Sequence, residues 1–305
     1  MEEKIRVALF GGQDLGYVMA EYFSARCDID LFVVSFHSRR DAINGYRSAL
    51  TLSKALGIPF IETSRPNEDA VAALREWKPD IIVSAYYARL FSPEILSIPR
   101  LGAINVHPGK FPHYQGSMPT PWYIINGEKS FGIGILQIDE GVDTGPVFVQ
   151  KDYPFPDDET GHGLLLRTQQ AAAELYKEYF DAIVRREIIA QPQVGQAVVC
   201  PRIEPQYRIN WNDPAEIISR QVRVHAGPYF PAYSYLYNRM ISINRAVFSN
   251  ESLPRSVAGE IIAVSDRGLT VACGTGTLVA TEYEFFPAIR PEQLELYLAP
   301  GSMLS

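Results

Sequence analysis

Cysteine and long apolar runs are what this chain has least of. Its 305 residues include 3 cysteines, Cys27, Cys200 and Cys273, and no two of them form a C-x-x-C pair. Such scattered cysteines argue against a disulfide framework and against a zinc knuckle. The first residues lack the pattern of a secretory signal, and no apolar stretch has the roughly 18 residues of a membrane span. We therefore expect a cytoplasmic protein with no membrane partner.

Positive charge is scarce as well. The chain has 28 Lys plus Arg against 35 Asp plus Glu, a formal net charge of −7. Proteins that bind a long polyanion rely on clustered Lys and Arg, so this balance disfavours nucleic acid as a partner. Arg39 and Arg40 are adjacent in the first half of the chain. An exposed loop explains this basic pair as well as a local anion site does.

Length and composition predict two folded domains. Apolar residues make up 47% of the chain and charged residues 21%, as in ordinary globular proteins. At about 150 residues per domain, the length corresponds to two cores. We place a first domain at residues 1–190, a linker rich in Pro and Gln at 191–205, and a second domain at 206–305.

The first domain alternates predicted strands and helices. Short apolar runs rich in β-branched residues occupy residues 5–10, 30–35 and 80–85. Apolar residues at helical spacing separate them, and a long amphipathic helix follows at 164–187. This alternation predicts an α/β fold, a Rossmann-like and mostly parallel sheet with helices on both faces.

The periodicity changes after Trp211. One further helical segment is followed by short apolar runs that D-R-G and G-T-G turns separate. Runs of this length with such turns are typical of antiparallel strands. We expect a smaller, β-rich and barrel-like C-terminal domain.

A glycine loop, "FGGQDLG", follows the first predicted strand. Its glycines, Gly11, Gly12 and Gly16, do not have G-x-G-x-x-G spacing, and no acidic residue clearly ends the second strand, so we expect no nicotinamide cofactor. Backbone amides of such a loop can still bind a phosphate or a sugar. We therefore include Gly11, Gly12 and Gln13 among candidate substrate-binding residues.

The stretch "AINVHPGKFPHYQGSMPTPW" contains the strongest candidate site. Asn105 and His107 are two residues apart at the end of a predicted strand, so their side chains project from the same face. Ligands bind beyond the carboxyl ends of the strands in an open parallel sheet. Further on, Asp139 and Asp143 lie in a glycine-flanked turn between two apolar runs. A carboxylate there can orient His107 and raise its pKa.

An amide and a protonated imidazole together can stabilise an oxyanion. The trio Asn105, His107 and Asp143 therefore suits acyl transfer to an amine without a covalent enzyme intermediate. A single Asn or His at a strand end is more often a hydrogen-bonded structural residue, and Asp139 can simply cap the turn. A metal site built from His107, His113 and the two aspartates matches no recognised ligand spacing, so we expect no metal.

The segment from Ala103 to Gln150 resembles the 10-formyltetrahydrofolate-dependent formyltransferases. These enzymes carry an Asn-x-His-Pro motif or a near variant, a Leu-Pro-x-Tyr-Arg-Gly segment, and an Asp-x-Gly-x-Asp-Thr-Gly turn. The elements occur here together and in order. "SAYYARLFSPEILSIPRLGAINVH" and "RINWNDPAEIISRQVRVHAGPYFPAYSYL" extend the resemblance over nearly the whole chain, more loosely after about residue 245.

The resemblance implies roles for individual residues. Asn105 would bind the oxyanion of a tetrahedral intermediate, His107 would protonate or polarise the formyl oxygen, and Asp143 would raise the pKa of the histidine. The folate would be held largely by backbone in two segments, whose residues are Arg89, Leu90 and Phe91 in one and Asp139, Glu140, Gly141 and Val142 in the other. The co-substrate would be 10-formyltetrahydrofolate. We add Tyr86, Tyr87 and Lys110 as candidate contacts to the acceptor.

Two motifs depart from the family pattern. Gln115 stands in "YQG" where many members have Arg, which removes a positive charge beside the site. Residues 109–112 read Gly-Lys-Phe-Pro where the family commonly has Ser-Leu-Leu-Pro. Neither change touches Asn105, His107 or Asp143, so both bear on contacts to the folate and to the acceptor.

The acceptor predicted from the resemblance is an amino group on a nucleotide-linked sugar. "YYARLF" and "PRIEPQYRINW" look closer to the formyltransferases of UDP-4-amino-4-deoxy-L-arabinose and of dTDP-linked amino sugars, which serve lipopolysaccharide and O-antigen biosynthesis. Methionyl-tRNA formylation would call for a Lys/Arg-rich insertion after the second strand and a basic second domain. The loop after the second strand is short, and residues 206–305 have no basic excess.

Two alternatives stay open. One is methionyl-tRNA formylation, and the other is an inactive module that binds folate or a nucleotide. The complete set of Asn105, His107 and Asp143 argues against the inactive module. The sequence fixes neither the sugar, nor its nucleotide, nor the oligomeric state, for which a homodimer is one option.

Overall fold

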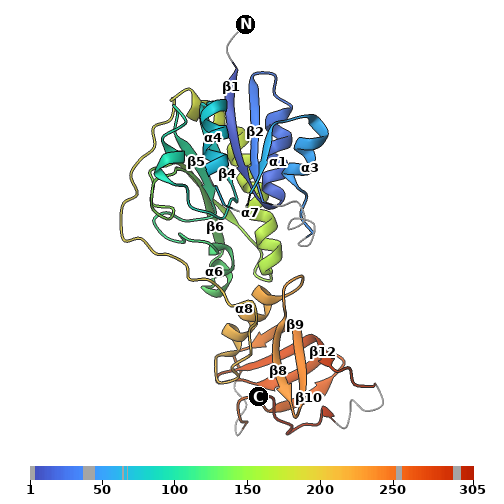
Figure 1. Cartoon of the computed structure of the whole chain (residues 1–305). Helices are drawn as coiled ribbons and strands as arrows, with labels where there is room; N and C mark the ends of the chain where they lie inside the picture. Colours follow the sequence, from blue (N-terminus) through green and yellow to red (C-terminus); the bar gives the residue numbers. More distant parts are fainter. Residues whose placement is uncertain (1–3, 37–44, 64, 67, 252–255, 291–296) are drawn as a thin grey trace. The chain divides into compact units, whose positions relative to one another are not determined.

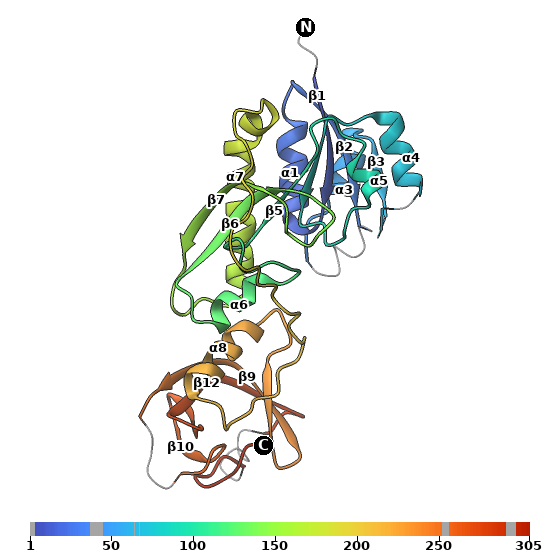
Figure 2. The same ribbon diagram turned by 90° about the vertical axis from the view of Figure 1, so that its left-hand side faces the viewer.

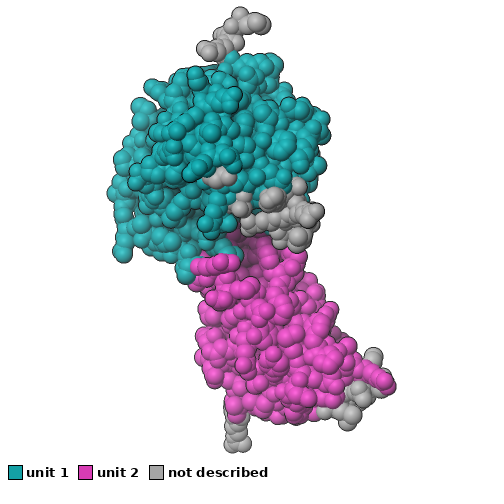
Figure 3. Space-filling view, in the orientation of Figure 1, with its two compact units in different colours: residues 1–119, 131–153, 167–201 teal, residues 120–130, 154–166, 202–305 magenta. Residues whose placement is uncertain are grey.

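The computed structural model describes residues 4–36, 45–63, 65–66, 68–251, 256–290 and 297–305. Arg39 and Arg40, and part of the loop after the second strand, lie outside these ranges. Two compact units are present, shown in different colours in Figure 3. Unit 1 comprises residues 1–119, 131–153 and 167–201, and unit 2 comprises 120–130, 154–166 and 202–305. The predicted limits, 1–190 and 206–305, remain a proposal about which parts fold on their own.

Unit 1 is built on a seven-stranded sheet of order β3-β2-β1-β4-β5-β6-β7 (Figure 1). Its first five strands in this order pair in parallel, and β6 pairs antiparallel to β5. The strands are β1 (Ile5–Gly11), β2 (Ile29–Ser35), β3 (Phe60–Glu62), β4 (Ile81–Ala85), β5 (Ala103–His107), β6 (Ser130–Gln137) and β7 (Val147–Pro154). The mostly parallel α/β sheet predicted from the alternating pattern is confirmed.

Helices cover both faces of this sheet, and Figure 2 shows α1 and α4 on opposite sides of it. Because side chains alternate along a strand, Phe10 and Val34 pack with Leu74 of α4 in one apolar cluster, while Val7 and Leu9 are buried on the other face. The helices that lie wholly or mainly in unit 1 are α1 (Gln13–Ser24), α3 (Ala49–Leu56), α4 (Glu68–Trp77), α5 (Pro93–Leu96) and α7 (Gly161–Val184).

The end of unit 1 is an extended segment that is hydrogen-bonded to the rest of the unit. Gln191 exchanges two backbone hydrogen bonds of 2.8 Å with Val147 at the start of β7. Further on, the Val198 amide donates to Pro112 at 3.1 Å, and the Cys200 amide donates to Gln115 at 2.7 Å. Residues 191–200, part of the predicted linker, therefore act as a strap across unit 1, and we refer to them below as the strap.

Unit 2 contains a five-stranded antiparallel sheet of order β10-β11-β12-β9-β8. Ile218 and Val222 of helix α8 lie in one core cluster with Ile241 and Leu278 of the sheet. The strands are β8 (Ala232–Leu236), β9 (Arg239–Ser249), β10 (Ile261–Ser265), β11 (Gly268–Ala272) and β12 (Thr277–Phe286), and the helices are α6 (Pro119–Ile125) and α8 (Ala215–His225). Strand β8 lies in a segment for which the sequence analysis predicted no strand.

The last residues of the chain join the two edge strands of this sheet. Ser305 exchanges two backbone hydrogen bonds with Tyr235 of β8, at 2.9 and 3.0 Å. Beside β10, the Leu304 amide donates to Gly259 and the Ile261 amide donates to Ser302, both at 2.8 Å. Edge strands are closed in this way in small barrels. The predicted barrel-like C-terminal domain is therefore confirmed.

Among the residues that the structure describes, no helix is long and apolar enough to cross a membrane.

The glycine pair of the first loop fixes how closely helix α1 approaches strand β1. A Cβ atom on Gly16 would lie 2.7 Å from the carbonyl carbon of Gly11, closer than real Cβ contacts. We expect Gly16→Ala to lower the thermal unfolding midpoint by about 2–8 °C, because overpacking backbone against backbone costs about 1–3 kcal/mol. Circular dichroism measures the midpoint.

Gly227→Ala is the control, because a Cβ at Gly227 would have no neighbour within 4 Å. Its midpoint should stay close to that of the parent. A Gly16→Ala protein as stable as this control would contradict the packing argument.

Candidate active site

The carboxyl end of strand β5 carries the first two predicted residues. Asn105 pairs with Ser84 of β4 on one side and with Leu136 of β6 on the other. His107 is the last residue of β5, and its side chain is buried at 8% exposure. Because the two residues are two apart in a strand, both side chains lie on the same face of the sheet. The strand therefore aims an amide and an imidazole at one point.

Asp143 lies in the turn between β6 and β7 and meets both of these side chains. Its Oδ1 accepts a hydrogen bond from Asn105 Nδ2 at 3.4 Å, and its Oδ2 lies 3.4 Å from His107 Nδ1. The Gly116 amide donates to Oδ2 at 2.9 Å. The turn thus brings the three predicted side chains within mutual reach.

The other ring nitrogen of His107 also faces a protein acceptor. Nε2 lies 2.8 Å from the carbonyl oxygen of Tyr114. A ring with a proton on each nitrogen satisfies this carbonyl and the Asp143 carboxylate together. A substrate oxygen that binds to Nε2–H would share it with the Tyr114 carbonyl or take its place.

Two glutamines hold the backbone of Asp143. Gln115 Nε2 donates to the Asp143 carbonyl at 3.0 Å, and Gln193 Nε2 donates to the same carbonyl at 2.7 Å. Gln193 also donates to the Gly145 carbonyl at 2.9 Å and accepts from Gln115 Nε2 at 2.9 Å. Asp143 has φ of 54°, a left-handed conformation that is uncommon for a residue other than glycine. The two amides therefore stabilise a strained turn.

The rest of this turn is held by Asp139. Its Oδ1 accepts from the Gly141 amide at 2.9 Å and from Thr144 Oγ1 at 2.7 Å. This is the capping role that the sequence analysis weighed for Asp139. Glu140 and Val142 are exposed, and Val142 presents an apolar side chain at 43% exposure.

The second candidate folate segment follows strand β4. Arg89 and Leu90 are exposed, and Leu90 is 63% exposed. Phe91 is buried in the sheet core, with its ring centroid 4.8 Å from that of Phe10. The Phe91 side chain thus belongs to the core, and only its backbone is left to meet a ligand.

The glycine loop is explained largely by packing. A Cβ on Gly12 would lie 2.5 Å from the Tyr86 carbonyl oxygen, and the Gly12 amide donates to Ala85 at 2.9 Å. Gln13 has φ of 54° and accepts at 3.0 Å from Gln169 on α7 through its side chain. The structure therefore gives each residue of this loop a structural contact, and its role toward an acceptor stays a prediction.

The candidate acceptor contacts Tyr86, Tyr87 and Lys110 differ in burial and in hydrogen bonding. Tyr86 donates to Thr168 at 3.0 Å, and burial raises its pKa. The Tyr87 hydroxyl is buried and has no hydrogen-bond partner among the described residues. Burial raises the pKa of Tyr87 to about 12. Lys110 is half-buried after β5, and a Cβ on Gly132 would lie 2.6 Å from its Cγ.

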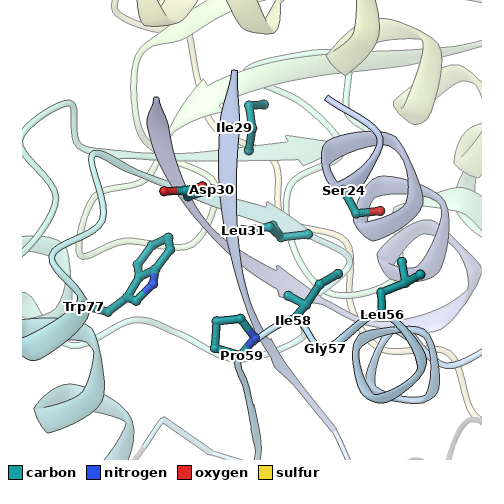
Figure 4. A pocket seen from close by; sticks show the side chains of 9 residues that line it. All are labelled: Ser24, Ile29, Asp30, Leu31, Leu56, Gly57, Ile58, Pro59 and Trp77. Atoms are coloured by element: carbon teal, nitrogen blue, oxygen red, sulfur yellow. The ribbon is translucent and has the colours of Figure 1, made fainter. Parts of the chain in front are cut away.

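A separate hollow lies at the start of strand β2, where the N-terminal ends of the parallel strands meet (Figure 4). It contains no residue of the candidate site. Its lining residues are Ser24, Ile29, Asp30, Leu31, Leu56, Gly57, Ile58, Pro59 and Trp77. Within the described ranges, no group of three or more His, Cys, Asp or Glu side chains is placed to hold a metal ion.

The sequence analysis missed three contributors to the site. These are the Tyr114 carbonyl, the Gly116 amide and the Gln193 side chain. The first two are backbone groups, which carry no residue-type signal. Gln193 lies in a Pro- and Gln-rich segment, and composition alone gives no reason to place it beside Asp143.

Comparison with known proteins identifies the class. An amide, an imidazole and a carboxylate gathered beyond the carboxyl end of a strand can stabilise the oxyanion that forms in acyl transfer. Residues 33–180 match the formyl transferase model, and residues 202–286 match the model of the formyl transferase C-terminal domain. The chain belongs to the formyl transferase family, and it is a formyltransferase.

Individual relatives come from two branches. Methionyl-tRNA formyltransferase of Citrifermentans bemidjiense is 33% identical over 232 residues, which cover 75% of this chain and 71% of that protein. Among solved structures, the N-formyltransferase of Helicobacter canadensis, in complex with folinic acid and dTDP-3-aminofucose, aligns with TM-score 0.71 and 16% identity over 90% of this chain and 98% of its own. The sugar 3N-formyltransferase WlaRD, with dTDP and 5-N-formyltetrahydrofolate, aligns with TM-score 0.68 and 15% identity, over 91% and 97%.

The contacts of Asp143 lead to a direct test. Asp143→Asn removes the negative charge. Its side-chain NH2 group, which cannot accept a hydrogen bond, would replace one of the two oxygens that accept from Asn105 Nδ2 and the Gly116 amide. We expect kcat for formyl transfer to fall at least about 100-fold, since a positioned acid–base group contributes about 10²–10⁴. Steady-state kinetics with 10-formyltetrahydrofolate measure the effect.

The matched control is Asp152→Asn, an exposed carboxylate on β7. It should keep kcat within about twofold. Equal loss in both variants would show that Asp143 has no special part in the reaction.

Proposed function

We propose that this formyltransferase moves the formyl group of 10-formyltetrahydrofolate to the amino group of a nucleotide-linked amino sugar. Membership in the formyl transferase family defines the group that is transferred. The donor and the acceptor are our proposal. The acceptor is a sugar attached to UDP or dTDP.

The observation that carries this acceptor is the extent of the structural likeness. The Helicobacter canadensis enzyme, solved with folinic acid and dTDP-3-aminofucose, aligns over 98% of its own chain, across both units of this one. A likeness at 16% identity establishes the fold, and the ligands belong to that protein. It supports the proposal because its TM-score, 0.71, is higher than the 0.57 of the methionyl-tRNA formyltransferase from Clostridium thermocellum, of which 95% is covered.

Charge in unit 2 also favours a sugar nucleotide over a transfer RNA. The last lysine of the chain is Lys177, so residues 202–305 contain none. Arg220 is paired with Glu216, and Arg245 lies 3.7 Å from Glu282. Arg223 donates to the carbonyls of two residues in the same unit. Binding a long phosphate backbone is favoured by an excess of cations, and residues 202–305 contain 9 Arg against 10 Asp plus Glu.

Methionyl-tRNA formylation is the second candidate. The curated relatives that support it are about one-third identical to this chain, including the 33% identical protein of Citrifermentans bemidjiense. The loop after the second strand, where the sequence analysis looked for a basic insertion, lies partly outside the described residues. The two acceptors therefore have to be separated by experiment.

In the proposed reaction the neutral amine of the sugar attacks the formyl carbon. A carbon–nitrogen bond forms as the carbonyl π electrons move to oxygen, and the resulting oxyanion accepts hydrogen bonds from Asn105 Nδ2 and His107 Nε2. A proton leaves the attacking nitrogen, and one is delivered to N10 of the folate. The bond from carbon to N10 then breaks, giving the formamide and tetrahydrofolate.

Asp143 supports these reaction steps through its contact with the Nδ1 side of the His107 ring. Its carboxylate faces Nδ1, so Nε2 is the nitrogen that can turn toward substrate. The folate would lie against the two exposed apolar side chains of the candidate segments, Leu90 and Val142, since a pterin needs flat apolar walls beside hydrogen-bonding backbone.

His107→Asn tests the assigned role. We expect kcat to fall at least about 100-fold because an amide does not exchange protons in this range, while affinity for folinic acid changes only a few-fold. Stopped assays of tetrahydrofolate release and isothermal titration with folinic acid measure the two quantities. His113→Asn, an exposed histidine of the same loop, is the control and should leave both unchanged. Full activity in His107→Asn would remove the residue from the mechanism.

A substrate panel tests the acceptor. Purified protein is given 10-formyltetrahydrofolate with UDP-4-amino-4-deoxy-L-arabinose, with dTDP-3-amino and dTDP-4-amino sugars, or with charged initiator tRNA, and tetrahydrofolate release is followed. We expect turnover with at least one amino-sugar nucleotide and none with tRNA.

Salt separates the two acceptor classes further. Sugar-nucleotide turnover should change little between 50 and 200 mM salt, conditions under which multi-phosphate contacts weaken by orders of magnitude. Salt-sensitive tRNA formylation without sugar turnover would replace the proposal by the second candidate. Folinic acid binding without turnover of any acceptor would favour a binding module.

A further inference from the structure

We propose that Gln193 and Gln115 act as positioning residues for Asp143, through a clamp on its main-chain carbonyl. The proposal rests on the part of the proposed function that places Asp143 beside His107. It goes beyond that function because Gln193 comes from the strap.

The first step is the conformation of Asp143. With φ of 54° the residue is in the left-handed region, where a residue with a side chain is strained by about 1 kcal/mol or more. Such a conformation persists only where the surroundings hold it. The carboxylate reaches both Asn105 and His107 from this conformation.

The second step is the pair of donors. One carbonyl oxygen of Asp143 accepts from Gln193 at 2.7 Å and from Gln115 at 3.0 Å, so both of its lone pairs are used. Gln193 reaches the Gly145 carbonyl as well, two residues further along the turn. The clamp therefore spans the C-terminal half of the turn.

The third step is the cost of this arrangement. Gln115 is 2% exposed, and its Oε1 has no hydrogen-bond partner among the described residues. A buried unpaired acceptor costs about 1–3 kcal/mol. Turning the amide over would place Oε1, an acceptor, against two other acceptors, the Asp143 carbonyl and Gln193 Oε1. The orientation is therefore explained by its two acceptors.

The fourth step is the origin of the two glutamines. Gln115 follows the strand that carries His107, and its amide and carbonyl are hydrogen-bonded to Val198 and Cys200 of the strap. Gln193 belongs to the strap itself. Three segments far apart in the sequence thus meet at one backbone carbonyl. In this proposal the strap acts on the carboxylate through the Asp143 carbonyl, to which Gln193 donates.

Gln193→Ala and Gln193→Glu test the clamp. Glutamate keeps the size of the side chain and loses both N–H donors, so a loss shared by both variants follows from the donors and not from packing. We expect kcat to fall about 10-fold or more in each, with KM for the folate and for the acceptor within about threefold. Gln191→Ala is the matched control, an exposed glutamine two residues earlier whose side chain donates to the Ile189 carbonyl. It should match the parent.

A second readout does not depend on turnover. The imidazole ¹⁵N signals of His107, assigned by comparison with His107→Asn, report the partners of its two nitrogens. They should shift in Gln193→Glu and stay in place in Gln191→Ala. If even the parent turns over no acceptor, the proposed function fails. The ¹⁵N measurement still shows whether Gln193 positions Asp143 beside His107.

Several outcomes would overturn the proposal. Unchanged kcat and unchanged ¹⁵N signals in both Gln193 variants would remove Gln193 from the site. A parallel rise in KM and fall in kcat, or unfolding of both variants by circular dichroism, would assign Gln193 a purely structural role. In a double-mutant cycle with Gln115→Leu and Gln193→Leu, fully additive losses would show that the two residues do not act on one group.

Discussion

The site depends on one carboxylate that is held in a strained conformation. Asp143 meets Asn105 and His107 only because its turn places a left-handed residue beside the end of strand β5. Its three side-chain and carbonyl oxygens each accept from a defined donor: the Gly116 amide on Oδ2, the Asn105 amide on Oδ1, and two glutamine amides on the carbonyl. Electrostatic catalysis works through groups that are oriented before the substrate binds. Here that orientation comes from neutral amides, which add no charge to compete with the carboxylate.

The stiffness of this site is spread over segments that are distant in sequence. Strand β5 supplies two side chains, the following loop supplies a carbonyl and an amide, the β6–β7 turn supplies the carboxylate, and the strap supplies Gln193. The strap is bonded to the start of β7 and also to the loop after β5. A displacement of any one segment would therefore be resisted by the others. Gln115 contributes to this network with its backbone, which is bonded to the strap, and with its side chain, which donates to the Asp143 carbonyl.

Much of this could be predicted from the sequence. The alternation of apolar runs and helical segments gives the parallel sheet, and a spacing of two puts Asn105 and His107 on one face. The rest is nonlocal. Strand β8 is a short run of alternating tyrosines and small residues whose pairing depends on β9, and composition cannot reveal it. Phe91 looks like a ligand contact in its loop but is drawn into the core by Phe10. Gln193 lies beside Asp143 because the strap is hydrogen-bonded to strand β7 and to the loop after β5, and its sequence does not indicate these contacts.

The difference between the two sets of relatives has a physical explanation in the same arrangement. All the contacts among Asn105, His107, Asp143 and the two glutamines lie within unit 1, and in the proposed reaction they would constrain where a formyl oxygen and a nitrogen meet. They do not constrain what the nitrogen is attached to. A chain can therefore be one-third identical to methionyl-tRNA formyltransferases and also share its fold with a structure solved with a sugar nucleotide. In the proposed reaction, specificity for the acceptor would come from charge and shape outside the trio, and residues 202–305, with 9 Arg and no Lys against 10 Asp plus Glu, lack the basic excess that favours binding of a long polyanion.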